Sequence, residues 1–106
     1  MDDKTIAWLA GLLEGEGCFR FSRTPHIILQ MTDEDIIRRV AGLWNKHYRA
    51  NLARTPNRKR VFTVEVFATD ALAVMGQIFP YMGERRKAKI AEVRFAALAR
   101  LGSTLT

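Results

Sequence analysis

The spacing of hydrophobic residues switches along the chain between the periods typical of helices and of strands. Leu9 and Leu13 keep helical spacing with Ile6, whereas Phe19 and Phe21 alternate with polar residues, as in a half-buried strand. The whole pattern predicts the order helix, strand, strand, helix, strand, strand, helix, helix over residues 4–14, 17–24, 26–32, 34–46, 48–55, 60–68, 71–79 and 84–101. This order fits an α+β fold in which an antiparallel four-stranded sheet carries helices on one face.

Residues that favour helix caps and turns separate the predicted elements. The predicted N-caps are Asp2 or Asp3, then Thr32 with Asp33, then Thr69 with Asp70. Thr24-Pro25 predicts the turn of the first hairpin, Pro56–Lys59 predicts that of the second, and Pro80 ends the third helix. Because no linker or low-complexity segment interrupts this pattern, we expect one domain over residues 1–106.

The charge of the chain predicts that this α+β domain has an anionic partner. The formal net charge is +6 and the isoelectric point is about 10.1, and nucleic acid is the commonest partner of such a chain. A merely basic soluble protein is the alternative. The basic residues gather in two stretches, 49–60 and 85–89, which lie outside the strongest apolar segments.

The sheet face that points away from the helices is predicted to be the DNA-contacting surface. Arg suits guanine, and Gln or Asn suits adenine, in the major groove. The predicted contact residues are Arg20, Ser22, Thr24, His26, Ile28, Gln30, Arg49 and Asn51 on the strands, with Arg58, Lys59 and Arg60 at the second turn. A solvated sheet face would also be polar. The scarcity of acids favours nucleic acid, since Glu65 is the one acid expected there.

Composition excludes several other classes of protein. No apolar run reaches the roughly 18 residues that a membrane span needs, and we expect no signal peptide. With one cysteine, Cys18, an intramolecular disulfide is excluded. One Cys and two His residues cannot form a Cys/His metal cluster. We therefore expect an intracellular, reducing location: a bacterial or phage-infected cytoplasm, or an organelle.

The most informative segment is LAGLLEGEG, residues Leu9–Gly17. Ala7, Gly11 and Gly15 recur every four residues, so their small side chains form one stripe that lets a second helix approach closely. Glu16 lies between two glycines where the helix must end. The helix dipole disfavours an anion at that terminus, and a cation or metal that shares the site would stabilise the carboxylate. An exposed helix that ends in a solvated Glu is the alternative.

This segment resembles the signature of the LAGLIDADG homing endonucleases. The resemblance covers nearly the whole chain, but the nonapeptide is its one specific motif and the rest is agreement of pattern. Members with two motifs are pseudo-symmetric monomers, so a chain with one motif implies a homodimer that binds double-stranded DNA. The resemblance places Ala7, Gly11, Glu14 and Gly15 at the contact between subunits, and Glu14 matches an acid whose role is chiefly structural.

The resemblance also implies a metal-dependent hydrolysis of DNA. Glu16, with Gly15 beside it, matches the position that binds Mg²⁺ (or Mn²⁺), although many members have Asp there. Arg85 matches a catalytic basic residue that is often Lys, and Lys87 is a second candidate. Asp33 matches a residue that positions water, but an Asp there also serves as a helix cap, which is the commoner role. No small-molecule cofactor and no membrane partner are implied.

Two other classes of function stay open. One is a DNA- or RNA-binding protein of the same fold, such as an intron maturase or a transcription regulator, that no longer cleaves. The intact acid at Glu16 argues against that loss. The other is a basic α+β interaction module with no nucleic-acid role. Cleavage of a duplex with Mg²⁺ would separate the endonuclease from both.

Overall fold

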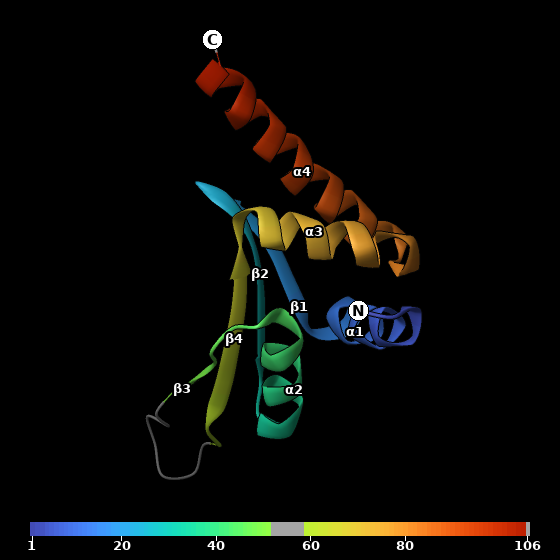
Figure 1. Ribbon diagram of the computed structural model, residues 1–106, viewed down its shortest axis with the longest axis vertical. Helices are drawn as coiled ribbons and strands as arrows, with labels where there is room; N and C mark the ends of the chain where they lie inside the picture. The colour runs from blue at the N-terminus through green and yellow to red at the C-terminus, as the bar shows by residue number, and fades with distance from the viewer. Residues whose placement is uncertain (52–58, 106) are drawn as a thin grey trace.

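Four antiparallel strands form one sheet, and α1, α2 and α3 lie on one side of it (Figure 1). The computed structural model describes residues 1–51 and 59–105, and only the backbone of 102–105. The elements are α1 (Asp3–Glu16), β1 (Gly17–Ser22), β2 (Thr24–Met31), α2 (Glu34–Trp44), β3 (Arg49–Asn51), β4 (Val61–Phe67), α3 (Ala68–Ile78), the 3-10 turn η1 (Phe79–Tyr81) and α4 (Glu84–Leu105). The strand order is β1-β2-β4-β3. The predicted α+β fold is confirmed.

The core lies between the sheet and the helices because alternate strand residues point toward them. Ile27 and Leu29 of β2 and Val64 and Val66 of β4 are buried on this face. The helix residues that complete the core are Leu9 and Leu13 of α1, Ile37 and Val40 of α2, Met75 and Ile78 of α3, and Ile90 and Val93 of α4. Full burial of each such side chain contributes about 1.5–3 kcal/mol. This core fixes which strand face stays exposed.

The motif helix α1 is capped at its start by Asp2 and runs to Glu16, slightly past the predicted end. The Asp2 carboxylate accepts a hydrogen bond of 2.8 Å from the Thr5 backbone N–H. Hydrogen bonding by the Thr5 side chain, and after it by this backbone N–H, lowers the pKa of Asp2 below its ordinary value. At the other end, the N–H of Gly17 donates to the Leu13 carbonyl. Glu16 is therefore the last helical residue, and the sheet begins directly after it.

Gly17 is required by close packing rather than by its backbone conformation. Its φ of −75° suits any residue, but a Cβ there would lie 2.8 Å from the Leu13 carbonyl oxygen. We expect Gly17→Ala to destabilise the fold by about 1–3 kcal/mol, as other overpacked sites do. Gly42 on α2 has nothing within 4 Å of such a Cβ. Gly42→Ala is the matched control, and we expect it to be neutral or to stabilise by up to ~1 kcal/mol. Denaturant unfolding checks both, and equal stabilities would contradict the packing argument.

The first hairpin turns one residue earlier than predicted. Arg23 occupies the turn with a φ of 65°, while Thr24 already belongs to β2. Pro25 is buried inside β2 opposite Phe21, so the prediction of a Thr24-Pro25 turn is wrong. A non-glycine residue with positive φ is uncommon, so the sequence carries no signal for this turn.

The predicted caps of the later helices also differ from the structure. α3 begins at Ala68, directly after β4, so the prediction that Thr69 and Asp70 precede this helix is wrong. Asp70 instead forms an ion pair of 3.2 Å with Lys46. Asp33 occupies the N-cap position of α2, but its side chain makes no capping hydrogen bond. Of the third predicted strand, Arg49–Asn51 is confirmed, and residues 52–58, with most of the second turn, lie outside the described residues.

Helix α4 runs along the edge of the molecule and its C-terminal half projects beyond the sheet (Figure 1). This half carries exposed apolar side chains, of which Phe95 is 73% exposed. Among the described helices, none combines the length and the apolar character that crossing a bilayer requires.

Candidate active site and nucleic-acid interface

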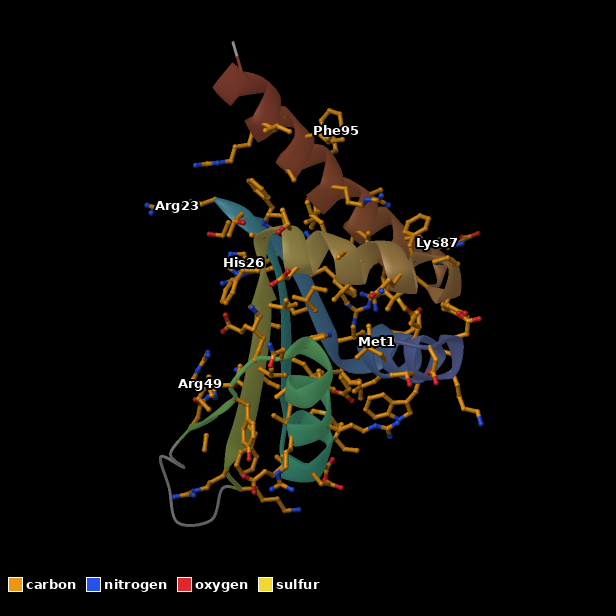
Figure 2. All side chains as sticks on the ribbon, viewed as in Figure 1. Met1, Arg23, His26, Arg49, Lys87 and Phe95 are labelled. Atoms are coloured by element: carbon orange, nitrogen blue, oxygen red, sulfur yellow. The ribbon has the colours of Figure 1, made fainter. Side chains whose placement is uncertain are left out.

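The strand register places every described strand residue predicted to contact DNA on the same face of the sheet. Paired residues of neighbouring strands project to the same side. The pairs on the face away from the helices are Cys18 with Ile28, Arg20 with His26, Ser22 with Thr24, Ile28 with Glu65, Gln30 with Thr63, Arg49 with Thr63, and Asn51 with Val61. Figure 2 shows His26 and Arg49 on the side of the sheet opposite the helices. We call this surface the outer face.

Hydrogen bonds and ring contacts orient several side chains of the outer face. Gln30 Nε2 donates to Thr63 Oγ1 at 3.2 Å. The His26 ring contacts Phe67 edge-on, with centroids 4.8 Å apart. These contacts restrict the rotamers, which lowers the entropy lost when the side chains bind a ligand.

One acid lies among the basic residues of the outer face. Glu65 is the only acid in the described strands, as predicted, and its Oε1 accepts a 2.7 Å charged hydrogen bond from Arg49. Arg49 therefore has an intramolecular partner before any ligand binds. Lys59 and Arg60 are exposed beside the start of β4, and Arg58 lies outside the described residues.

Glu16 is exposed at the junction of α1 and β1. Gly17 pairs with Leu29, so Glu16 lies at the same end of the sheet as the last residues of β2 and as Asp33, which follows β2. Gly15, beside it, is also exposed. Within residues 1–51 and 59–105, no three or more His, Cys, Asp or Glu side chains gather closely enough to hold a metal. A metal at Glu16 thus needs ligands from outside this part of the chain.

A surface cleft beside the junction of α1 and β1 has three basic residues on its α4 side. The cleft has a volume of about 410 Å³ and is lined by Gly17, Cys18, Phe19, Arg85, Arg86, Ala88, Lys89 and Glu92. Arg85 and Lys89 are one helical turn apart, so both face the cleft from α4. The predicted residue Arg85 is therefore close to the Gly17 end of the motif. Lys89 was not among the predicted site residues, although its spacing of four from Arg85 is a signal for it.

The neighbours of Arg85 have different surroundings. Arg86 Nε donates a 3.0 Å hydrogen bond to the Glu14 carbonyl, and its guanidinium lies 5.6 Å from the Phe19 ring centroid. The Nζ of Lys87 lies 5.5 Å from the Phe79 ring centroid, and Lys87 is not among the cleft residues. Figure 2 shows Lys87 on the far side of α4 from the labelled residues of the outer face.

The stripe of Ala7, Gly11 and Gly15 is exposed on the single chain. A Cβ added at Gly11 or Gly15 would meet nothing within 4 Å. These glycines are therefore not explained by packing within one chain. Glu14, predicted beside them at the subunit contact, binds its own chain: its Oε1 accepts a 3.1 Å hydrogen bond from the N–H of Gly83.

The same fold occurs in solved structures of homing endonucleases. No family model and no curated protein matches the sequence. The archaeal intron-encoded homing endonuclease I-Vdi141I, solved in complex with DNA, aligns with a TM-score of 0.70 at 13% identity over 96% of this chain and 72% of its own. The homing endonuclease I-CvuI, solved with its target Sro1.3 in the presence of 2 mM Ca, aligns with a TM-score of 0.56 at 16% identity over 91% of this chain.

The chain has the LAGLIDADG homing endonuclease fold. It spans 65% of the length of I-CvuI, so it is shorter than that protein. Within this LAGLIDADG fold, the motif helix presents two different sides: Leu9 and Leu13 are buried in the core of the chain, whereas Gly11 and Gly15 are exposed. The motif helix ends at Glu16, and the next residue, Gly17, lines the basic cleft of α4.

Proposed function

We propose that the chain is a site-specific endonuclease that cleaves double-stranded DNA as a homodimer with Mg²⁺ or Mn²⁺. The observation that carries the proposal is the position of Glu16, which lies where the motif helix meets β1, beside the Arg85 cleft. The fold shared with endonucleases solved with DNA supports it. The test is whether the purified protein cleaves duplex DNA with Mg²⁺ and stops doing so when the metal is chelated. Binding of duplex DNA without cleavage would favour a regulator or maturase.

The outer face supplies the DNA-binding surface in this proposal. In one row, Gln30 of β2 and Arg49 of β3 flank the buried Thr63 of β4, and Arg20 and His26 form another row. Such a two-dimensional array of donors suits the base edges of the major groove. Lys59 and Arg60, which lie outside the strands, suit the phosphate backbone.

The carboxylate of Glu16 has the chemistry that a Mg²⁺ site needs. Mg²⁺ keeps several waters and is bound through one or two carboxylates together with substrate phosphates, so a lone Glu per chain is compatible with it. A bound metal would activate water and neutralise charge that develops on the phosphate. Arg85 in the cleft stabilises that charge through its guanidinium, but its high pKa makes it a poor general base.

The surroundings of Asp33 and Lys87 differ in what they allow each side chain to do. The Asp33 side chain makes no capping bond and lies at the Glu16 end of the sheet, so it is free to hold a water molecule. Lys87 contacts Phe79 away from the cleft, so the basic catalytic role falls to Arg85 rather than to Lys87.

The homodimer explains why the stripe of Ala7, Gly11 and Gly15 is exposed. Two α1 helices that pack through small residues approach closely, and two-fold symmetry makes the same patch serve both subunits. The ends of the two helices then lie together, so each dimer has two Glu16 carboxylates at one place. A dimer also reads two related half-sites, so the proposed target is partly palindromic.

DNA binding should depend strongly on salt, and the outer face should set base preference. Arg20→Ala or Gln30→Ala should cost about 1–3 kcal/mol at particular base pairs. Lys59→Ala should weaken binding about equally for all sequences and reduce the salt slope by about 1, because it removes a phosphate contact. Equilibrium binding to a panel of single-base target variants at several salt concentrations checks this. Uniform losses for Arg20 and Gln30 would show that the outer face does not read bases.

A further inference from the structure

Two hydrogen bonds join the end of α1 to the start of α4, across 69 and 72 residues of sequence. Glu14 Oε1 accepts from the Gly83 N–H at 3.1 Å, and the Glu14 carbonyl accepts from Arg86 Nε at 3.0 Å. Glu14 thus contributes both its side chain and its backbone to one junction, which we call the α1–α4 junction. Its other carboxylate oxygen, Oε2, is buried and has no hydrogen-bond partner among the described residues.

The electrostatics of the two helix ends explain why this junction forms. Glu14 lies in the last turn of α1, where the helix dipole disfavours an anion. Its carboxylate instead reaches the N-terminus of α4, where unpaired backbone N–H groups and the dipole favour an anion. Arg86 acts in the opposite direction: its cationic side chain, from the start of α4, donates to the Glu14 carbonyl near the C-terminus of α1. Each helix end therefore satisfies groups of the other.

The junction lies next to both proposed catalytic groups. On α1, Glu16 follows Glu14 by two residues, and on α4, Arg85 follows Gly83 by two residues. A helix is rigid over two residues. The contact between Glu14 and Gly83 therefore fixes how Arg85 lies relative to Glu16. We propose that Glu14 is a positioning residue that aligns the Arg85 cleft with Glu16 for cleavage. This inference rests on the proposed endonuclease function.

Gly83 offers a way to break the junction without touching either catalytic group. A Cβ at Gly83 would lie 2.6 Å from Glu14 Oε1. That oxygen is at the tip of a flexible side chain, so Gly83→Ala should displace the carboxylate rather than the backbone. Gly76 on α3 is the matched control, because it is exposed and a Cβ there meets nothing within 4 Å.

The test compares these variants in single-turnover cleavage of a cognate duplex with Mg²⁺, in duplex binding and in thermal unfolding. We expect Gly83→Ala to lower the cleavage rate about ten- to a hundredfold, the size of effect that a misplacement near 1 Å produces. Duplex affinity should be unchanged, since the junction is not on the outer face. Gly76→Ala should cleave like the wild type.

Substitutions of Glu14 then separate positioning from simple support of the fold. Glu14→Gln keeps an amide oxygen for the Gly83 N–H and should retain most activity, whereas Glu14→Ala should lose as much as Gly83→Ala. The double variant Glu14→Ala, Gly83→Ala should be no slower than either single one, because both break the same contact.

Three outcomes overturn the inference while leaving the proposed function in place. Cleavage by Gly83→Ala at the rate of Gly76→Ala would show that the junction does not position the cleft. Additive losses in the double variant would show that the two residues act separately, and a loss of rate matched by a loss of duplex affinity or folding would make the junction structural. If the wild type binds duplex and never cleaves it, the proposed function itself fails, and the positioning role fails with it.

Discussion

Glu16→Gln is expected to abolish cleavage with Mg²⁺ while leaving DNA binding largely intact. The substitution keeps the shape of the side chain and removes the negative charge that attracts the cation. Loss of a single preorganised electrostatic group in an active site typically costs 10²–10³-fold in rate, and we expect a loss on the order of 10³-fold or more because the metal itself is lost. Binding should stay equal or tighten, since two carboxylates per dimer no longer repel phosphates.

The measurement for Glu16 is a nicking assay on a cognate duplex, run beside equilibrium binding. Asp3→Asn is the control, because Asp3 is an exposed acid at the opposite end of the same helix. It should cleave like the wild type. A wild-type cleavage rate in Glu16→Gln would show that Glu16 is not a catalytic residue. Equal losses of rate in Glu16→Gln and Asp3→Asn would show that the net charge of the protein, rather than a metal ligand, causes the effect.

Gly11→Leu should convert the proposed dimer to a folded monomer that neither binds its full site tightly nor cuts it. On the single chain, nothing lies within 4 Å of an added Cβ at Gly11, so the chain itself can accept the larger side chain. A second α1 helix packed against this stripe cannot accept a leucine there, because the two helices approach closely only where the side chains are small. The expected result is therefore loss of association without loss of the fold.

Light scattering at micromolar concentration measures the mass, and thermal unfolding confirms that the variant is folded. Gly42→Leu on α2 is the control, since Gly42 is also exposed with open space beside it. We expect it to remain a dimer. A wild type that is already a monodisperse monomer, or a Gly11→Leu variant that stays dimeric, would contradict the proposed interface.

Alternation of residue types predicted the fold because β1 and β2 are each buried mainly on one side. In β1, Phe19 is buried and Arg20 is exposed. The same period in β2, with the pairing of β3 against β4, places the predicted DNA-contacting residues on one face. The stripe of Ala7, Gly11 and Gly15 on α1 was also predictable from the sequence, since residues four apart lie on the same face of a helix. These features depend on local sequence, so the sequence alone specifies them.

Features that depend on distant parts of the chain were not predictable in this way. The contact between Glu14 and Gly83 joins residues 69 apart, and no local pattern indicates it. The start of α3 was misplaced because β4 leads directly into Ala68, whose φ of 56° is unusual for alanine. Lys89 is different: its helical spacing from Arg85 was visible, but only the position of β1 shows that both line one cleft.

Selection of cleaved sites from a randomised duplex library tests whether the protein is a site-specific endonuclease that depends on Glu16. The wild-type protein is incubated with the library and Mg²⁺, and the ends produced are sequenced, with Glu16→Gln treated in parallel. We expect cuts in both strands at one family of partly palindromic sites, and none from Glu16→Gln. Duplexes that are bound but never cut by the wild type with Mg²⁺ or Mn²⁺ would contradict the proposed endonuclease function.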